Sequence, residues 1–239
     1  MDKFNLLNFP NPDELANAVA QKWLAQLSAR TSSAPNYCVA FSGGRIAKTF
    51  SAAVTKIATE KRISFPSVHF FWADECCVPP TAPESNFAIA QQLIFSPLGI
   101  PQNQIHRIHG EDEPSRAAAN ASDELTRLAP KSADNQPIFD MIFLGLGENG
   151  HIASLFPEES EAERQNKAVY RPVVATKPPP RRITLGYFAI AAAREVWMLA
   201  SGSGKEDALR ESLKPDGQTP FARVLKMRTQ TLIFSDIRI

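Results

Sequence analysis

The chain has 239 residues, of which 44% are hydrophobic and 21% are charged, and its formal net charge is +1. These proportions are typical of a globular protein with a sizeable core. The balanced charge argues against a general nucleic-acid-binding protein, which carries a basic excess. Because no linker, repeat or charge block divides the sequence, we expect one domain over residues 1–239.

The sequence has no signal for secretion or for membrane insertion. Its first ten residues, MDKFNLLNFP, lack the apolar segment of a signal peptide, and no apolar run has the length of a membrane span. The three cysteines, of which Cys76 and Cys77 are adjacent, do not form a disulfide framework. We therefore expect a cytoplasmic protein with no membrane partner.

In the first half of the chain, short apolar strands alternate with amphipathic helices. Residues 11–14, NPDE, combine a capping residue, a first-turn proline and two acids, which is typical of a helix start. The spacing of the apolar residues predicts helices over residues 12–27, 46–57, 84–95 and 114–128, and strands over residues 37–41, 68–72 and 105–108.

The second half continues this alternation. Residues 158–167 are polar and form a solvated helix or loop, and residues 177–182, KPPPRR, form a rigid basic surface loop, since three prolines cannot lie in a central strand. The alternation predicts an α/β fold with a single open, mostly parallel, Rossmann-like sheet and helices on both faces. The apolar pattern predicts strands over residues 141–144, 169–175, 196–200 and 231–235, and helices over residues 189–194 and 220–225.

A glycine-rich turn, LGLGENGH over residues 144–151, follows a buried strand. Its glycines match the G-x-G-x-x-G pattern of dinucleotide-binding proteins, but that pattern also needs an acidic residue about 20 positions on, at the end of the next strand. The next strand candidate, residues 168–175, contains no acid, and Pro157 limits any helix that starts at the last glycine. We therefore interpret the glycines as a tight turn that places His151 at the edge of the sheet.

The turn Ser42-Gly43-Gly44 lies between a predicted strand and a predicted helix. Backbone N–H groups at a helix N-terminus are unpaired, and the helix dipole there favours an anion. Arg45 and Lys48 add positive charge to the first turn, which opposes the dipole unless an anion lies between them. We favour a phosphate site over the alternative, a plain turn that needs glycine and carries two solvated cations.

Further polar residues follow other strands. Asp74 and Glu75 could act as a base or an orienting group, and equally as a loop acid and a helix cap. Arg182 ends the proline-rich loop, and Lys205 begins a helix after a Ser-Gly-Ser-Gly turn that lacks the Walker A spacing. Because turns after parallel strands emerge on one edge of a sheet, we expect these residues to converge with His151 around a small phosphorylated ligand.

His151 is the predicted general base, because histidine is the side chain best suited to proton transfer near pH 7. A general base contributes about 10²–10⁴-fold to a rate. The sequence therefore favours a substrate with an activated bond, such as a strained ester. The other histidines have no metal-ligand partner at a useful spacing, and we predict packing or surface roles for His69, His106 and His109.

Five sequence blocks resemble, in order, the 6-phosphogluconolactonases within the glucosamine-6-phosphate isomerase/6-phosphogluconolactonase family. They read FSGG, WADE with VPP and ESNF, LGLGENGHIASLFP, PRRITL, and GSGK. Each block alone is a weak match, but the five together are specific. They occupy residues 41–44, 72–87, 144–157, 180–185 and 202–205.

The resemblance implies a fold shared with sugar-phosphate deaminases and isomerases. It also implies hydrolysis of 6-phospho-D-glucono-1,5-lactone to 6-phosphogluconate in the pentose phosphate pathway, with neither a metal nor an organic cofactor. In this interpretation His151 activates water, while Gly43, Gly44, Arg182 and Lys205 hold the phosphate and sugar ends. We expect a monomer or a small homo-oligomer whose ligand is a phosphorylated sugar lactone, with no nucleic-acid partner.

Three positions depart from the family pattern. Cys76 stands where an arginine is expected after Asp-Glu, Asn149 where an aspartate is expected before the histidine, and Arg45 where serine or threonine is expected. We expect Arg45 to supply the missing positive charge from another turn. Asn149 can hydrogen-bond His151, but it cannot stabilise an imidazolium as a carboxylate does.

Two alternative functions stay open on the sequence alone. In a deaminase or isomerase of the same fold, Asp74 would abstract a proton next to a carbonyl. Such enzymes typically carry a G/A-F-N-E-P type segment after the histidine, where this chain has SLFP at residues 154–157. A catalytically weakened sugar-phosphate-binding protein is suggested by Cys76 and Asn149, although such a protein has no need of His151 as a base.

Overall fold

The computed structural model describes residues 3–31 and 35–239, and nine strands of this part form two sheets. The larger sheet has the order β1-β9-β8-β5-β2-β3, and every neighbouring pair in it is parallel. This confirms the predicted open α/β sheet. Its strands are β1 Phe4–Asn8, β2 Tyr37–Phe41, β3 Val68–Trp72, β5 Met141–Gly145, β8 Glu195–Ala200 and β9 Thr231–Ser235.

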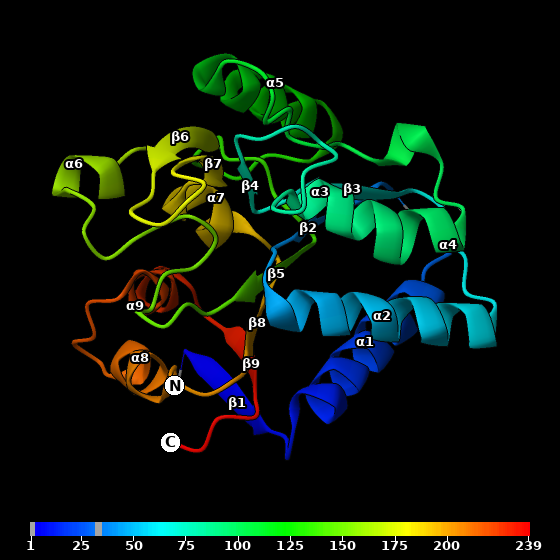
Figure 1. Cartoon of the computed structure of the whole chain (residues 1–239), viewed down its shortest axis with the longest axis horizontal. Helices are drawn as coiled ribbons and strands as arrows, with labels where there is room; N and C mark the ends of the chain where they lie inside the picture. The colour runs from blue at the N-terminus through cyan, green and yellow to red at the C-terminus, as the bar shows by residue number, and fades with distance from the viewer. Residues whose placement is uncertain (1–2, 32–34) are drawn as a thin grey trace.

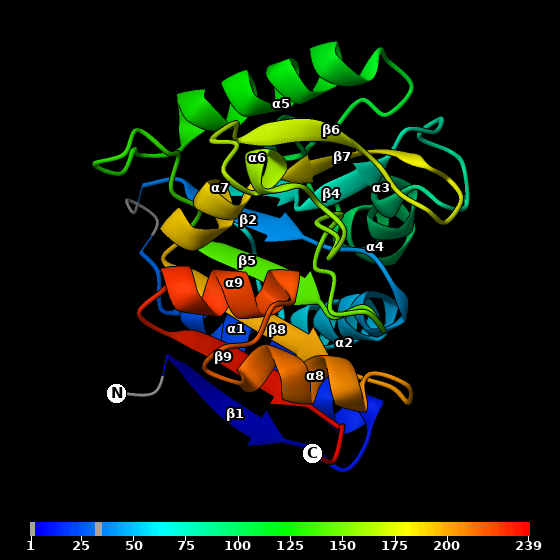
Figure 2. The ribbon, with the colours of Figure 1, turned by 90° about the vertical axis from the view of Figure 1, so that its left-hand side faces the viewer.

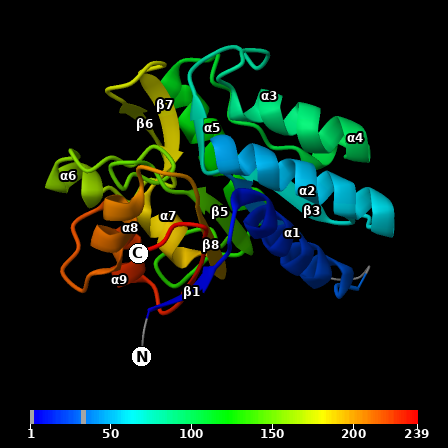
Figure 3. The same cartoon turned by 60° about the horizontal axis from the view of Figure 1, so that its bottom comes forward.

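Helices cover both faces of this sheet, as predicted. On one face α1, Pro12–Ser28, and α2, Arg45–Lys61, pack against each other, and on the other face lie α7, Tyr187–Ala192, α8, Glu206–Leu213, and α9, Pro220–Met227 (Figures 1 and 2). Strands covered on both faces must be apolar throughout, and every residue of β2 is buried. Figure 3 shows α1 and α2 together on the side away from α8 and α9.

The core beneath α1 is aromatic. Asn11 caps this helix by accepting a hydrogen bond from the Glu14 N–H at 2.9 Å, as the sequence predicts. Trp23, fully buried on α1, lies edge-on to Phe41 of β2 and Phe143 of β5, with ring centroids 5.7 and 5.3 Å apart. These contacts attach α1 to the middle strands, whose carboxyl ends carry the functional turns described below.

A second sheet, of three antiparallel strands, was not predicted. Its order is β4-β7-β6, formed by β4, Asp74–Cys76, β7, Arg181–Leu185, and β6, Tyr170–Val174. The predicted strand over residues 169–175 is β6 of this sheet. The predicted loop is shorter than expected, because Arg181 and Arg182 already lie in β7, where Arg181 pairs with β6 and Arg182 pairs with both β4 and β6. Helix α5, Pro114–Leu128, packs on β6 and β7 (Figure 2).

The remaining elements are short. The predicted strand over residues 105–108 is wrong, since only Ile105 pairs, in a single bridge with Phe70. The chain turns at once after Ile108, where Gly110 N–H donates to its carbonyl. The short elements are α3 Asn86–Ala90, a π-helical turn Gln91–Phe95, α4 Ser96–Leu98, a 3₁₀ turn Gln102–Gln104 and α6 Glu161–Arg164.

This arrangement determines where a site can form. Because the large sheet is parallel, the segments that follow β2, β3, β5 and β8 all leave it at the same edge. Strand β4 follows β3 directly, so the small sheet is attached at that edge. No helix among residues 3–31 and 35–239 is both long and apolar enough to cross a membrane.

Candidate active site

The turn after β5 is shaped to present His151. The Gly147 N–H donates to the His151 carbonyl at 2.9 Å, and the Gly150 N–H donates to the Gly147 carbonyl at 3.0 Å. A Cβ on Gly147 would lie 2.0 Å from the His151 ring, and Gly150 has φ +80 and a position where a Cβ would lie 2.6 Å from Thr219. The glycines therefore make room for an imidazole, as the sequence interpretation predicts.

Asn149 fixes the tautomer of His151. The Asn149 Oδ1 atom lies 2.6 Å from His151 Nδ1 and 3.3 Å from the His151 backbone nitrogen. A backbone N–H can only donate, so this side-chain atom is an acceptor, and Nδ1 must carry the ring proton. The other ring nitrogen, Nε2, therefore keeps its lone pair and can act as a base.

The surroundings of His151 disfavour its charged form. Burial and the nearby cations Arg182, Lys205 and Lys177 lower the pKa of His151 to about 4. The imidazole is therefore neutral at pH 7. An anion that bound among these cations would offset their charge and raise the pKa of His151, making the imidazole a stronger base when a ligand is present.

The turn after β2 offers backbone donors and a cation. Helix α2 begins after Gly44, which has φ +96, and no side chain caps the helix or adds an acid to its first turn. Arg45 is the first residue of α2. The Ser42 hydroxyl is buried and has no hydrogen-bond partner among the described residues, which is unusual for a buried polar group and indicates room for a ligand acceptor.

The turn after β8 brings a second cation beside Arg45. Asp236 holds this turn by accepting hydrogen bonds from the Ser201 hydroxyl at 2.8 Å and the Gly202 N–H at 3.0 Å. Burial and the charge of Arg45 lower the pKa of Lys205, which stands at the start of α8. Two cations this close repel each other unless an anion lies between them.

The small sheet closes the site. Asp74 on β4 is buried, and its carboxylate accepts a hydrogen bond from the Ser154 hydroxyl at 2.7 Å. Burial raises the pKa of Asp74, while the Ser154 hydrogen bond and Arg182 oppose this rise. Arg182 lies opposite Cys76 in the β4–β7 register.

These segments enclose one cleft with two adjoining compartments. The first, about 190 Å³, lies between the turns after β2 and β8 and the small sheet. The second, about 470 Å³, lies toward Asn149, Lys177 and Phe156. The residues common to both compartments are Leu146, Gly147, His151, Arg182 and Lys205.

Nine of the ten residues proposed from the sequence lie along this cleft. Glu75 does not, because its carboxylate faces the start of α3 and accepts hydrogen bonds from the backbone N–H groups of Cys76, Asn86 and Phe87 and from the Ser85 hydroxyl. Glu75 thus has the helix-cap role that the sequence left open. The nine lining residues are Ser42, Gly43, Gly44, Arg45, Asp74, Asn149, His151, Arg182 and Lys205.

Three residues of the site were missed. Asn86 lines the first compartment, donates to the Asp74 carbonyl at 2.9 Å and leaves no space for a side chain on Gly43. Asn86 stands in the ESNF block, which was its only signal in the sequence. Ser154 stands in the LGLGENGHIASLFP block and Lys177 in the basic KPPPRR loop, but the place of each at the site depends on contacts between distant segments.

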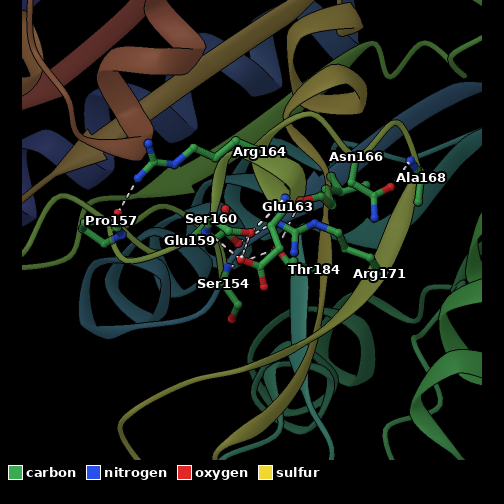
Figure 4. A network of polar contacts seen from close by, with 11 residues as sticks. Ser154, Pro157, Glu159, Ser160, Glu163, Arg164, Asn166, Ala168, Arg171 and Thr184 are labelled. Atoms are coloured by element: carbon green, nitrogen blue, oxygen red, sulfur yellow. Dashed lines mark hydrogen bonds and ion pairs between the residues drawn. The ribbon is translucent and has the colours of Figure 1, made fainter.

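The segment after His151 is tied to the small sheet. The Ser154 N–H donates to the Thr184 hydroxyl at 3.1 Å, and Glu159 forms a buried ion pair with Arg171 of β6 (Figure 4). These two contacts hold the His151 turn against β6 and β7.

The remaining histidines have packing and surface roles, as predicted. His69 Nδ1 lies 2.8 Å from His106 Nε2, and His106 Nδ1 lies 2.8 Å from Glu124 Oε1 on α5. His109 is exposed. Among residues 3–31 and 35–239, no group of three or more histidine, cysteine or acidic side chains could hold a metal ion.

A family model described as glucosamine-6-phosphate isomerases/6-phosphogluconolactonase matches residues 10–234 of this chain. The chain belongs to this family. A 6-phosphogluconolactonase of Haemophilus influenzae is 32% identical over 211 residues, which cover 87% of this chain and 84% of the relative.

Solved structures agree with the assignment to the glucosamine-6-phosphate isomerase/6-phosphogluconolactonase family. The 6-phosphogluconolactonase from Trypanosoma brucei matches with a TM-score of 0.83 and 26% identity, over 98% of this chain and 97% of that chain. A monomeric glucosamine-6-phosphate deaminase, 16% identical, shares the fold with a TM-score of 0.80 over 97% of both chains. The predicted relationship to sugar-phosphate deaminases is therefore confirmed at the level of the fold.

The three departures from the 6-phosphogluconolactonase pattern all lie along the cleft. Cys76 lines the first compartment opposite Arg182, and Arg45 lines it from the start of α2. Burial raises the pKa of the Cys76 thiol to about 11, so the thiol brings no charge to the compartment at neutral pH. Asn149 hydrogen-bonds His151, as expected.

Proposed function

We propose that this protein hydrolyses 6-phospho-D-glucono-1,5-lactone to 6-phosphogluconate in the oxidative pentose phosphate pathway. The observation that carries the proposal is a neutral His151 whose Nε2 lone pair is kept available by Asn149, inside a cleft lined by four cations. Family membership and the named 6-phosphogluconolactonase relatives support the same substrate.

In the proposed reaction, His151 Nε2 removes a proton from a water molecule as its oxygen attacks the lactone carbonyl carbon. The imidazolium that forms keeps its hydrogen bond to Asn149 Oδ1. When the tetrahedral intermediate collapses, the bond between the carbonyl carbon and the ring oxygen breaks. The ring oxygen takes the proton from the His151 imidazolium as it leaves, which gives a hydroxyl group and returns His151 to its neutral form. The new carboxylic acid, which keeps the second proton of the water, then loses that proton to solvent and becomes the carboxylate of 6-phosphogluconate.

The cations and backbone donors bind the substrate's charge. Arg45, Lys205 and the N-terminus of α2 converge on the first compartment, where a phosphate group would relieve the repulsion between the two cations. The Ser42 hydroxyl gains an acceptor there. Arg182 lines both compartments, as His151 and Lys205 do, and adds positive charge where the two compartments meet.

The proposal is tested by lactone hydrolysis with the wild type and with His151→Ala. We expect the wild type to accelerate decay of fresh lactone above the buffer rate and His151→Ala to lose about 10²–10⁴-fold in kcat, the usual contribution of a general base. His109→Ala, which changes an exposed histidine, is the matched control and should keep full activity. A wild type no faster than buffer would refute the lactonase proposal.

A second candidate is a deaminase or isomerase of the same fold, in which Asp74 abstracts a substrate proton. The observation in its favour is the burial of Asp74 in the same cleft as His151. Release of ammonia from glucosamine 6-phosphate would identify this activity. Tight binding of 6-phosphogluconate together with a rate unaffected by His151→Ala would instead indicate a weakened sugar-phosphate-binding protein.

The remaining expectations extend the proposal to the cell. We propose that the protein acts in the cytoplasm on a small phosphorylated sugar lactone, as one domain over residues 1–239 and as a monomer or small homo-oligomer. Each proposed step uses side chains of this chain and requires neither a metal nor an organic cofactor.

A further inference from the structure

Ser154 lies behind the cleft and is fully buried. It is three residues after His151, in the segment that Figure 4 shows against the small sheet. Its backbone N–H donates to the Thr184 hydroxyl at 3.1 Å, and Thr184 is the register partner of Asp74 in the β4–β7 ladder. The backbone of Ser154 is thus fixed beside the strand that carries Asp74.

The Ser154 hydroxyl is directed at a carboxylate of the site. It donates to Asp74 Oδ2 at 2.7 Å, the distance of a strong O–H···O bond, and both side chains are buried. Asp74 also lines the first compartment together with His151. Since the bond immobilises one carboxylate oxygen, it determines how Asp74 is oriented toward the cleft.

Few charges surround Asp74. The titratable groups whose charges act on Asp74 are Arg182 on β7, Tyr170 on β6, and Glu75 and Cys76 of its own strand, and His151 lines the same compartment. Of these only Arg182 favours the ionised carboxylate. Burial works against that form, so the Ser154 hydrogen bond is one of two contacts that favour it.

We propose that Ser154 is a positioning residue for Asp74: its hydroxyl group holds one carboxylate oxygen, so that the other oxygen can accept a hydrogen bond from a hydroxyl group of the sugar. The inference rests on the proposed lactonase function only for the identity of the substrate. An ionised carboxylate accepts from a polyol hydroxyl, and a protonated one presents a competing donor. Ser154 therefore acts through Asp74 and does not touch the substrate.

The decisive experiment follows the Asp74 carboxyl group by ¹³C NMR as the pH is varied, in the whole protein without substrate. The signal is assigned by its loss in Asp74→Asn. We expect Ser154→Ala to move the titration midpoint of Asp74 upward by about one to two pH units, the size expected when a hydrogen bond to a charged group is removed. An unchanged midpoint in Ser154→Ala would overturn the proposal.

Two further variants separate an effect on the titration of Asp74 from an effect on the stability of the protein. Thr184→Val removes the acceptor of the Ser154 N–H but leaves the Ser154–Asp74 bond, so it should lower the thermal midpoint and leave the Asp74 titration unchanged. Ser154→Thr keeps the hydroxyl and should restore the Asp74 titration, even where the added methyl group lowers stability. An upward shift of equal size in Thr184→Val, or no restoration in Ser154→Thr, would contradict the proposal.

Kinetics then connect the bond to catalysis. In the lactone assay, the acidic limb of the kcat/KM profile, to which the base His151 also contributes, should move upward in Ser154→Ala and stay in place in Thr184→Val. A wild type without lactonase activity would refute the proposed function while the NMR result still decides the role of Ser154. A shifted NMR midpoint with an unmoved kinetic limb would show that Asp74 does not serve the reaction through Ser154.

Discussion

The adjacent carboxylates Asp74 and Glu75 lie on opposite sides of strand β4 and differ in how many hydrogen bonds they accept. Asp74 faces the cleft and is held by one hydroxyl group and the charge of Arg182. Glu75 faces α3 and accepts hydrogen bonds from three backbone N–H groups and from the Ser85 hydroxyl. Both carboxylates are buried, so burial does not distinguish a site residue from a structural one. The number of fixed hydrogen-bond donors does distinguish them, since a carboxylate that already accepts hydrogen bonds from several protein groups has no lone pair left for a substrate.

This comparison predicts that the helix side of β4 maintains stability and the cleft side maintains activity. Groups kept in incompletely paired positions for function commonly cost stability. The following substitutions test that division, from the largest expected effect to the smallest.

Glu75→Ala should destabilise the protein by about 3–5 kcal/mol, because it leaves buried backbone N–H groups, two of them at the start of α3, without a hydrogen-bond acceptor. Urea unfolding at pH 7 measures the effect. The exposed neighbour Glu84 offers the matched control, and Glu84→Ala should change stability by no more than about 0.5 kcal/mol. Equal effects of the two substitutions would contradict a structural role for Glu75.

His151 should make the protein less stable in acid. Its pKa of about 4 in the folded state is below the ordinary value of 6.5, so the unfolded chain binds the proton more readily and stability falls as the pH drops from 6.5 to 4. The loss amounts to about 3 kcal/mol. Urea unfolding between pH 4 and 7 should show this loss in the wild type and in His109→Gln, but not in His151→Gln.

Inorganic phosphate should reduce this loss, because an anion among Arg182, Lys205 and Lys177 offsets the charge that disfavours the imidazolium. An identical pH dependence with and without phosphate would argue against an anion site beside His151.

Asp74→Asn should reduce kcat/KM by about 10²-fold, or about 2.7 kcal/mol, if the carboxylate accepts from the substrate. Its effect on unfolding should stay within about 1 kcal/mol, because asparagine can still accept from Ser154 and no buried charge remains. The lactone assay and urea unfolding on the same sample test both parts. A variant that loses stability and keeps its rate would reverse the assignment of the two sides of β4.

Arg45→Ala should raise KM about tenfold, the cost of losing one charge-assisted contact of about 1.4 kcal/mol. Lys48→Ala, in the same exposed helical turn but outside the cleft lining, is the control and should leave KM unchanged. Cys76→Arg should restore KM in the Arg45→Ala background, since position 76 faces the same compartment. If neither Arg45→Ala nor Cys76→Arg alters KM, the proposal that Arg45 compensates for the missing arginine at position 76 is refuted.

Several helices and strands could be predicted from the local pattern of apolar and polar residues. The helix predicted over residues 114–128 and the strands predicted over residues 37–41, 68–72 and 231–235 have the bounds found in the structure. Strand β1 was missed, because it lies at the edge of the sheet, where none of its five residues is buried and two asparagines interrupt the apolar residues. The small sheet was missed because β4 pairs with β7 across a long stretch of sequence, and because the prolines between β6 and β7 conceal the start of β7.

The sequence by itself determined the parallel α/β fold, the glycine turn that presents His151 and the cations at the strand ends, because these follow from local periodicity and from the common edge of parallel strands. Only the tertiary structure decided which of Asp74 and Glu75 faces the cleft. It also decided that Ser154 reaches Asp74 from 80 positions away. Such contacts depend on how separate segments pack, and no spacing within one segment encodes them.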